Sequence, residues 1–253
     1  MPRMMPLSDA ALADLRGPLT AFVRDDDAGW DDPGLLRLLD VMHRAEVPID
    51  LAVIPTALGA LLAQELRLRM AQMPGLLGVH QHGHSHLNHE TEGRKCEFGG
   101  SRALEVQRED LSDGLGMLRS AFGSQLDAIF TPPWNRCDGA TPALLAELGY
   151  TALSRDRSAP RQDALPELAV DVDWTRHYRA GGVPALDAAT ATAISRCASG
   201  QGPLGLMLHH AVMTPDEHAL LAHWLQDLQT LGRLTWCRMP ALRPPFSAQG
   251  PSR

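Results

Sequence analysis

Short apolar runs alternate with longer segments of helical periodicity along most of the chain. In the first such pair, Leu19–Arg24 has the length and composition of a strand, and Pro33–Ala45 carries leucines at the spacing of an amphipathic helix. The same alternation continues to the carboxyl end. Further strands are expected at Ile49–Ile54, Leu76–His80, Asp127–Thr131, Thr151–Ser154, Leu168–Asp173, Leu204–His209 and Leu234–Cys237, and further helices at Thr56–Met73, Ser101–Phe122, Thr141–Leu148, Ala185–Ser199 and Pro215–Leu231.

Strands that alternate with helices predict an α/β fold with a parallel sheet, and about seven such strands most simply close into a distorted β/α barrel. With 253 residues, 44% of them hydrophobic, the chain is long enough to bury one full core. No linker separates two domains, so we expect a single barrel domain at 19–240, preceded by an N-terminal segment at 1–18. The tail at 241–253 is rich in proline, serine and glycine, which predicts disorder.

Charge and composition narrow the classes of partner. The chain has 23 basic and 30 acidic residues, a formal net charge of −7, and no long basic run. This balance argues against nucleic acid or an anionic membrane surface as the main partner. No segment approaches roughly 18 uninterrupted apolar residues, and the N-terminus lacks the apolar core of a signal peptide, so we expect a cytoplasmic protein with no integral membrane segment. The scattered cysteines form no CxxC pair and are expected to be reduced thiols.

Polar clusters follow several of the predicted strands. His80–His89 holds five of the eleven histidines, and three successive aspartates follow the first strand. Alone, a triple aspartate is usually a solvated turn, and a histidine run can be a surface tract. However, the polar clusters all fall at strand ends, where barrel enzymes place their chemistry, and carboxylate with imidazole suits zinc or a related metal. The clusters are Asp25–Asp27, His80–His89, Pro132–Asn135, Asp171–Trp174 and His209–His210.

The order of these clusters resembles the five motifs of the NodB-homology polysaccharide deacetylases, metal-dependent carbohydrate esterases built on a distorted β/α barrel. Residues 23–27 (VRDDD) stand where the family has TFDDG, and a downstream proline and leucine pair, Pro33 and Leu35-Leu36, support that register. Residues 82–86 (HGHSH) match a motif that often reads HTWSH. The later motifs RPPYG, DxxW and LxH are matched by Thr131-Pro132-Pro133-Trp134-Asn135, by Asp171-Val172-Asp173-Trp174 and by Leu206-Met207-Leu208-His209.

The resemblance implies roles for particular residues. Asp26, His82 and His86 would bind one divalent ion, most simply zinc, with cobalt, nickel or manganese as alternatives. Asp25 would be the general base, and His209 would protonate the departing group while Asp171 orients its imidazole. The oxyanion would be held by the metal and the backbone N–H of Trp134. The residues expected to line the oxyanion and substrate site are Trp134, Pro133, Asn135, Asp27, Arg94 and Lys95.

Three positions depart from the family pattern. Thr131 replaces the arginine of the third motif, which normally steadies the base, and Arg24 and Arg136 are the candidates to substitute for it. Asp27 replaces a glycine and adds negative charge; it would raise the pKa of Asp25, bind substrate amines, or cap the following turn. His84 replaces a tryptophan at a packing position.

The predicted function is metal-dependent removal of an N- or O-acetyl group from a sugar. The loop Asn88–Gly100 follows the histidines, and its Arg94 and Lys95 are candidate clamps for a phosphate or carboxylate. An intracellular glycan or surface-polysaccharide intermediate is therefore the favoured substrate. Two alternatives stay open: a metal-dependent amidase acting on a small non-carbohydrate amide, and a catalytically silent metal- or glycan-binding module. The oligomeric state also stays open.

Overall fold

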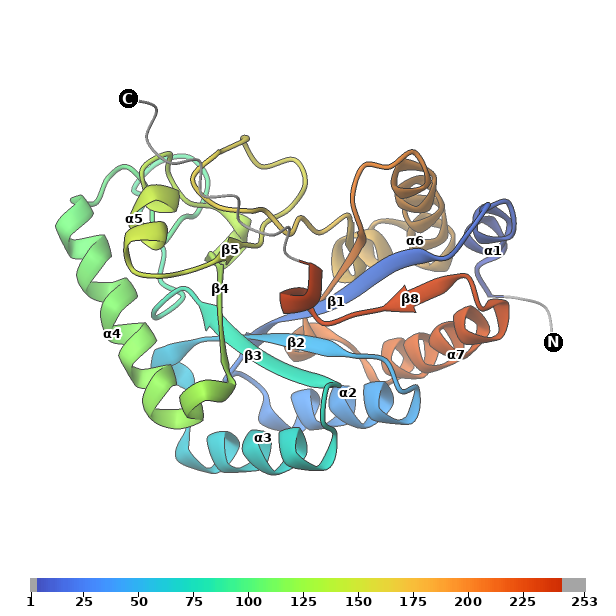
Figure 1. The fold of residues 1–253 in the computed structure, drawn as a ribbon, viewed down its shortest axis with the longest axis horizontal. Helices are drawn as coiled ribbons and strands as arrows, with labels where there is room; N and C mark the ends of the chain where they lie inside the picture. Colours follow the sequence, from blue (N-terminus) through green and yellow to red (C-terminus); the bar gives the residue numbers. More distant parts are fainter. Residues whose placement is uncertain (1–3, 243–253) are drawn as a thin grey trace.

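A parallel β-sheet runs through the centre of the protein (Figure 1), of which the computed structural model describes residues 4–242. Its strand order is β5-β4-β3-β2-β1-β7-β6, with β8 paired to the start of β1, and every strand pair is parallel. The strands are β1 (Leu19–Ala28), β2 (Ile49–Val53), β3 (Leu77–His82), β4 (Leu126–Thr131), β5 (Ala152–Leu153), β6 (Val172–Asp173), β7 (Leu204–Leu208) and β8 (Leu234–Trp236).

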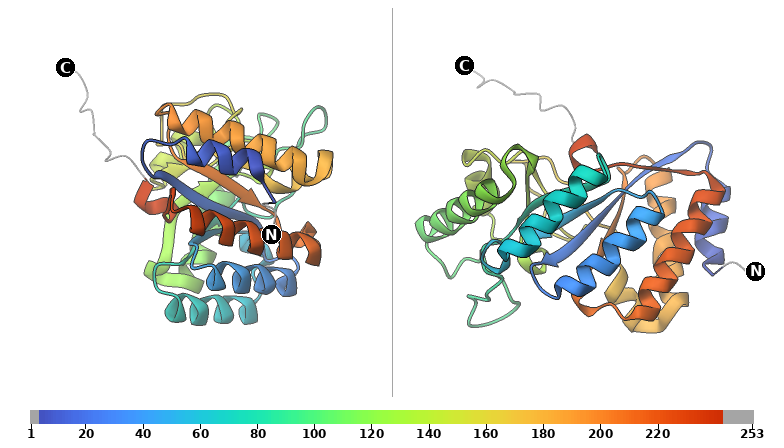
Figure 2. Two further views of the ribbon diagram at one scale, coloured as in Figure 1. Left: turned by 90° about the vertical axis from the view of Figure 1, so that its right-hand side faces the viewer. Right: turned by 90° about the horizontal axis from the view of Figure 1, so that it is seen from below.

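Helices cover the outer face of this sheet. Seen from below, α3, α2 and α7 lie side by side across it (Figure 2), in the order of the strands that they follow. The α-helices are α1 (Pro6–Ala13), α2 (Asp32–Arg44), α3 (Ala60–Gln72), α4 (Leu104–Phe122), α5 (Thr141–Glu147), α6 (Trp174–Ala198) and α7 (Pro215–Leu231). The 3₁₀ turns are η1 (Pro55–Ala57), η2 (Gly123–Gln125), η3 (Pro133–Asn135), η4 (His210–Val212) and η5 (Met239–Leu242).

The sheet curls so that its two edge strands, β5 and β6, approach each other through an irregular segment. The amide of Leu168 donates to the carbonyl of Leu153 at 2.9 Å, and the amide of Arg157 donates to the carbonyl of Val170 at 3.0 Å. These bonds bridge the space between the edges without forming a regular strand. The predicted α/β fold with a distorted β/α barrel is therefore confirmed.

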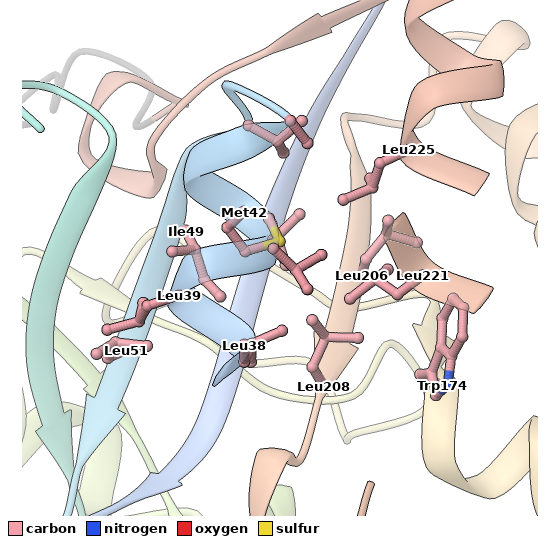
Figure 3. Close-up of a cluster of buried hydrophobic side chains, with 14 of the residues drawn as sticks. Leu38, Leu39, Met42, Ile49, Leu51, Trp174, Leu206, Leu208, Leu221 and Leu225 are labelled. Carbon is pink, nitrogen blue, oxygen red and sulfur yellow. The ribbon is translucent and has the colours of Figure 1, made fainter. Parts of the chain in front are cut away.

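The main core lies between the sheet and its outer helices (Figure 3). Leu38 and Leu39 of α2 pack there with Leu206 of β7 and Leu221 of α7, all of them 3% exposed or less. Burying each such side chain stabilises the fold by about 1.5–3 kcal/mol. The helices cover one face of the strands and the barrel interior covers the other. The strand sequences are therefore continuous apolar runs, without the alternation of apolar and polar residues that a half-exposed strand has.

Most predicted elements are confirmed to within a few residues, and three differ for local reasons. The predicted helix Thr56–Met73 is split, because Leu58 and Gly59 are extended and α3 starts only at Ala60. The predicted strand Leu168–Asp173 is reduced to β6, since the residues before it make only isolated bridges. The helix predicted to start at Ala185 begins at Trp174 and is kinked where Gly182 has φ 63°, just before Pro184.

The described part of the N-terminal segment is packed onto the barrel. The carboxylate of Asp187 in α6 accepts hydrogen bonds from the amides of Leu7 and Ser8 at 2.9 and 2.8 Å, which satisfies the amino end of α1. Of the predicted tail, Ala241 and Leu242 belong to η5, and the rest lies outside the described residues. Across residues 4–242, no helix combines the length and the apolar character needed to cross a membrane.

Candidate functional site

One carboxylate and two imidazoles meet at the carboxyl end of the sheet. Oδ1 of Asp27 lies 3.2 Å from Nε2 of His82 and 3.1 Å from Nε2 of His86. The candidate ligand atoms all lie within 4.8 Å of one another, and the side chains are 14%, 1% and 9% exposed. The arrangement can therefore hold a metal ion, and its donor set suits zinc or a neighbouring transition metal.

Both histidine rings are held in place by their neighbours. Nδ1–H of His82 donates to the carbonyl oxygen of Thr131 at 3.0 Å, so that its Nε2 faces Asp27. The ring of His86 lies between those of Trp30 and Trp134, with centroid distances of 4.6 and 4.5 Å. A hydrogen bond to the second ring nitrogen fixes which nitrogen is free to bind a metal, and the backbone carbonyl performs that task here.

The backbone of β1 turns Asp27 toward the histidines. Successive strand residues point to opposite faces, so Arg24 and Asp26 face one way and Asp25 the other. The pairing of β1 with β2 shifts register between Asp25 and Ala28, and Asp27 itself has φ 71°. This bulge with a left-handed residue points Asp27 toward His82, whereas regular alternation would point it to the same face as Asp25. Non-glycine residues in such conformations cluster at functional sites.

Asp26 is held by a buried arginine. Nε and Nη2 of Arg24 donate to the two carboxylate oxygens of Asp26 at 2.7 and 2.9 Å, and the arginine side chain is fully buried. Arg24 also donates to Ser154 at 2.7 Å and to Asn135 at 2.6 Å. Burial would raise the pKa of Asp26, but the positive charges of Arg24, His82 and His209 together outweigh it and keep the pKa below its usual value.

The arginine beside the aspartates is thus Arg24. Arg136, the other candidate to replace the family arginine, instead donates from Nη1 to the carbonyl of Lys95 at 3.0 Å. Thr131, at the position of the family arginine, places its hydroxyl 2.8 Å from Nε2 of His80. His80 is fully buried, and this burial lowers its pKa to about 3, so its ring is neutral at ordinary pH.

Asp25 faces away from the metal-ligand cluster. Its Oδ2 lies 2.6 Å from Nδ1 of His210, and its Oδ1 accepts from the His210 amide at 3.0 Å, with both side chains fully buried. Nε2 of His210 donates to the carbonyl of Trp30 at 2.7 Å. Burial would lower the pKa of His210, but Asp25 raises it to about 9. The residue predicted as base is therefore half of a buried ion pair.

His209 stands at the wall of the site, but not beside Asp171. Its Nδ1 lies 4.0 Å from Oδ1 of Asp173, the N-cap residue of α6. The carboxylate of Asp171 is held by Arg157, by Arg196 at 2.8 Å and by the amide of Gly205 at 3.0 Å. Asp171 therefore does not make the predicted orienting contact with His209, and the carboxylate near His209 is that of Asp173.

Two adjoining cavities open at this end of the barrel. The first, of about 440 Å³, is lined by the metal-ligand cluster together with Asp26 and His209. The second, of about 350 Å³, is lined by Arg94, Asn135 and several further arginines. They share wall residues, so the two form one cleft. The shared residues are Trp134, Asp173, Arg176 and His209.

Comparison with known proteins identifies the fold. No protein-family model and no curated protein matches the sequence. Among solved structures, an assigned polysaccharide deacetylase from Mycobacterium smegmatis is similar with a TM-score of 0.67 and 18% identity, over 90% of each chain. A family 4 carbohydrate esterase from Streptomyces lividans, in complex with acetate, has a TM-score of 0.54 and 16% identity, over 88% of this chain and 92% of that one. A CE4 family pseudoenzyme from Bacillus anthracis has a TM-score of 0.56 and 12% identity, over 90% and 66%.

The chain has the fold of the polysaccharide deacetylases. The resemblance inferred from the motifs is thereby confirmed at the level of the fold, for a divergent sequence. Within this deacetylase fold, Pro133 is buried against Gly83, Asn135 bonds Arg24, and the ammonium of Lys95 lies 5.9 Å from the ring centroid of Trp134.

Several residues of this deacetylase-fold site carry no motif signal. Glu97 is fully buried, and its carboxylate accepts hydrogen bonds from the amides of His84 and Ser85 at 3.1 and 2.7 Å. Trp30 packs on a candidate ligand, and Asp173 is the carboxylate nearest His209. Asp173 stands at a variable position inside the DxxW motif, whereas Glu97 and Trp30 become recognisable only when the loops are folded.

Proposed function

We propose that this protein is a metal-dependent hydrolase that removes an acetyl group from an acetylated sugar. The observation that carries the proposal is the placement, in one cavity, of a candidate metal-binding cluster beside a second carboxylate held by Arg24. Asp27, His82 and His86 are assigned as the metal ligands and Asp26 as the general base. Both carboxylate roles thus move by one residue from the motif-based expectation of Asp26 as ligand and Asp25 as base.

The residues fit a divalent ion. One carboxylate and two imidazoles leave coordination positions open for water and substrate, as catalytic zinc sites require. When bound, such an ion supplies Lewis acidity, which polarises an acetyl carbonyl and lowers the pKa of water. Oδ1 of Asp27 already faces both Nε2 atoms, so little rearrangement of the chain is needed to present these three donors.

Asp26 is suited to accept the proton of the attacking water. Its carboxylate lines the cavity beside Asp27, and Arg24, with His82 and His209, favours its ionised form despite burial. A base must be ionised to work and must lie within reach of its proton. Asp25 lies out of reach, because it faces away from the cavity and both of its oxygens are occupied by His210.

His209 is assigned to protonate the departing amine or alcohol. It lines both halves of the cleft, and Asp173 is the carboxylate placed to orient its ring. The backbone N–H of Trp134 is assigned to stabilise the oxyanion of the tetrahedral intermediate. Trp134 has φ 55°, a left-handed conformation that sets the direction of this turn over the site.

The sugar substrate is supported by the fold and by what similar structures are described as binding. The Streptomyces lividans esterase was solved with acetate, the product of a deacetylation. Other structures with this fold are described as pseudoenzymes, so turnover has to be measured directly.

The test is acetate release by the zinc-loaded protein from a panel of N- and O-acetylated sugars, with N-acetyl amino acids as small non-carbohydrate amides. Asp26→Asn should keep zinc and lose roughly 10²–10⁴-fold in kcat, whereas Asp27→Asn should lose zinc. Asp113→Asn, an exposed change on α4, is the matched control. Acetate release from only the small amides would make the protein an amidase, and zinc binding without any release would make it a silent module.

A further inference from the structure

The second cavity of the cleft has a charge opposite to that of the protein. Four arginines line it, against two carboxylates, Asp156 and Asp173, in a chain whose formal net charge is −7. An excess of cationic side chains in a concave site attracts anions locally, whatever the net charge of the molecule. The arginines are Arg94, Arg136, Arg155 and Arg176.

Two of these arginines are already neutralised within the protein. Nε of Arg155 lies 2.7 Å from Glu167, and its side chain is almost fully buried. Nη1 of Arg176 lies 3.8 Å from Asp156. Within residues 4–242, by contrast, neither Arg94 nor Arg136 has a carboxylate at ion-pair distance. The positive charge available to a ligand therefore resides on these two side chains.

Arg136 is held in position but incompletely satisfied. Its Nη1 donates to the Lys95 carbonyl at 3.0 Å, while its Nε is buried without a hydrogen-bond partner among the described residues. Burial and the positive charge of Arg94 both lower the pKa of Arg136. A guanidinium with a buried unsatisfied N–H and a like charge nearby is unfavourable, unless an anion accepts the hydrogen bond and offsets the repulsion.

We propose that this cavity binds an anionic group, a phosphate or a carboxylate, carried by the same acetylated sugar whose acetyl group lies at the metal-ligand cluster. This inference rests on the proposed function for the identity of the sugar. The two cavities share Trp134, Asp173 and His209 as walls, so one ligand can occupy both. Guanidinium groups present paired donors to phosphate and carboxylate oxygens, which a neutral sugar hydroxyl matches poorly.

Lys95 strengthens the same side of the cleft. Its ammonium lies over the Trp134 ring, 5.9 Å from the centroid, at the wall that divides the two cavities. Arg94 and Lys95 both belong to the loop that follows the histidines, and both are exposed. The ligand chemistry is thus supplied by one fixed arginine, Arg136, and by two cations of an adjacent loop.

The test compares N-acetylglucosamine with N-acetylglucosamine 1-phosphate and with N-acetylmuramic acid, which carries a carboxylate. Binding of each is measured by calorimetry in metal-free protein, so that no metal ion attracts the anion, and acetate release is measured in zinc-loaded protein. The variant is Arg94→Gln/Arg136→Gln. The control is Arg161→Gln, a side chain that is 92% exposed and paired only with Asp163.

The double variant should weaken binding of at least one anionic sugar about 10- to 100-fold, the usual effect of losing charge-assisted hydrogen bonds. The double variant should bind N-acetylglucosamine as wild type does, and the control variant should bind all three sugars as wild type does. The anionic sugar that binds more tightly distinguishes phosphate from carboxylate. Equal binding of all three sugars by wild type and double variant would overturn the inference. Arginine-dependent binding without acetate release from any sugar would instead support the anion site and refute the proposed activity.

Discussion

At the scale of single residues, three adjacent aspartates occupy three unlike environments. Asp25 is buried against His210, Asp26 is held by Arg24, and Asp27 faces two histidines. Strand alternation separates the first two, and the left-handed backbone at Asp27 produces the third environment. Identical side chains therefore differ in chemistry because the backbone points them toward different partners.

The Asp25–His210 pair predicts a pH dependence of stability. The folded-state pKa of His210 is about 9, above the ordinary value of about 6.5 for an unfolded chain. Its contribution is fully present below pH 6.5 and is lost as the pH rises from 6.5 through 9. The loss should be on the order of 3 kcal/mol, from a difference of about 2.5 pKa units. Urea unfolding of metal-free protein at intervals from pH 6 to 10 measures it.

Asp25→Asn provides the comparison for this pH series. It removes the charge that raises the pKa of His210, so the variant should be less stable at pH 6 but should lose less stability than wild type on going to pH 10. If the two curves stay parallel across this range, His210 does not titrate there in the folded state and the assignment of a charged pair is wrong.

The sequence predicted residues that the structure brings together, but it could not fix the direction in which each side chain points. His82, His86 and the aspartate run were all recognised, because carboxylate and imidazole at strand ends indicate a metal. The alignment with TFDDG assigns roles by position along the chain, and a bulge at Asp27 leaves no mark in the apolar pattern. Arg24 and Arg136 were both candidates to replace the arginine that the family has at the position of Thr131. Only the packing distinguishes them, because Arg24 contacts Asp26 whereas Arg136 contacts the Lys95 carbonyl.

At the scale of elements, the turn after β3 is shaped by a residue from the following loop. Oε1 of Glu97 accepts from the amide and the hydroxyl of Ser85 at 2.7 and 3.0 Å, and Oε2 accepts from the amide of His84 at 3.1 Å. Gly83 has φ +57°, and a side chain there would meet Glu97 and Pro133. The spacing between His82 and His86 is thus maintained by a buried carboxylate.

Glu97→Gln should weaken zinc binding. The amide group keeps the size of the side chain, but its NH₂ cannot accept the hydrogen bonds that one carboxylate oxygen receives. Loss of such support to metal ligands typically lowers affinity about 10- to 100-fold. Competition with a chromogenic zinc chelator measures the change. Glu92→Gln, an exposed position of the same loop, is the control, and equal affinity of the two variants would make Glu97 unimportant for the metal ligands.

Element boundaries were predictable where local chemistry sets them. Helix α7 begins at Pro215 after Thr214, which forms a capping box with Glu217, and it ends before Gly232. Strand β6 was overestimated because Leu168 and Val170 are apolar but pair with residues 153–157 only in isolated bridges. An apolar run predicts burial, whereas a ladder also requires a partner strand in register.

At the scale of the whole molecule, the two ends of the barrel have different tasks. The end opposite the cleft is closed by Met239 and by Arg238, which donates to Asp50 at 2.9 Å and also contacts Asp127. Gly78 leaves the space that Arg238 occupies. The cleft end carries the left-handed residues Asp27, His86 and Trp134. This division agrees with barrels in which one end supplies stability and the other supplies chemistry.

The contact between α1 and α6 predicts that the N-terminal helix unfolds together with the barrel domain expected at 19–240. Asp187 is buried and accepts from the amides of Leu7 and Ser8 and from the Ser8 hydroxyl. Asp187→Ala leaves those buried donors unsatisfied and should lower the free energy of unfolding by about 1–3 kcal/mol. Urea unfolding followed by circular dichroism and by tryptophan fluorescence, which reports on the buried Trp174–Trp224 pair, should show coincident single transitions.

The outcome distinguishes a docked helix from an independent appendage. Ser195→Ala, an exposed change on the same helix α6, should leave the transition unchanged. If α1 is part of the cooperative unit, Asp187→Ala shifts the midpoint and leaves the slope of the transition unaltered. A smaller slope with the same fluorescence midpoint would mean that α1 detaches while the barrel stays folded. In that case the boundary near residue 18 would separate a dispensable segment from the domain, because the sheet and its outer helices already bury the main core without α1.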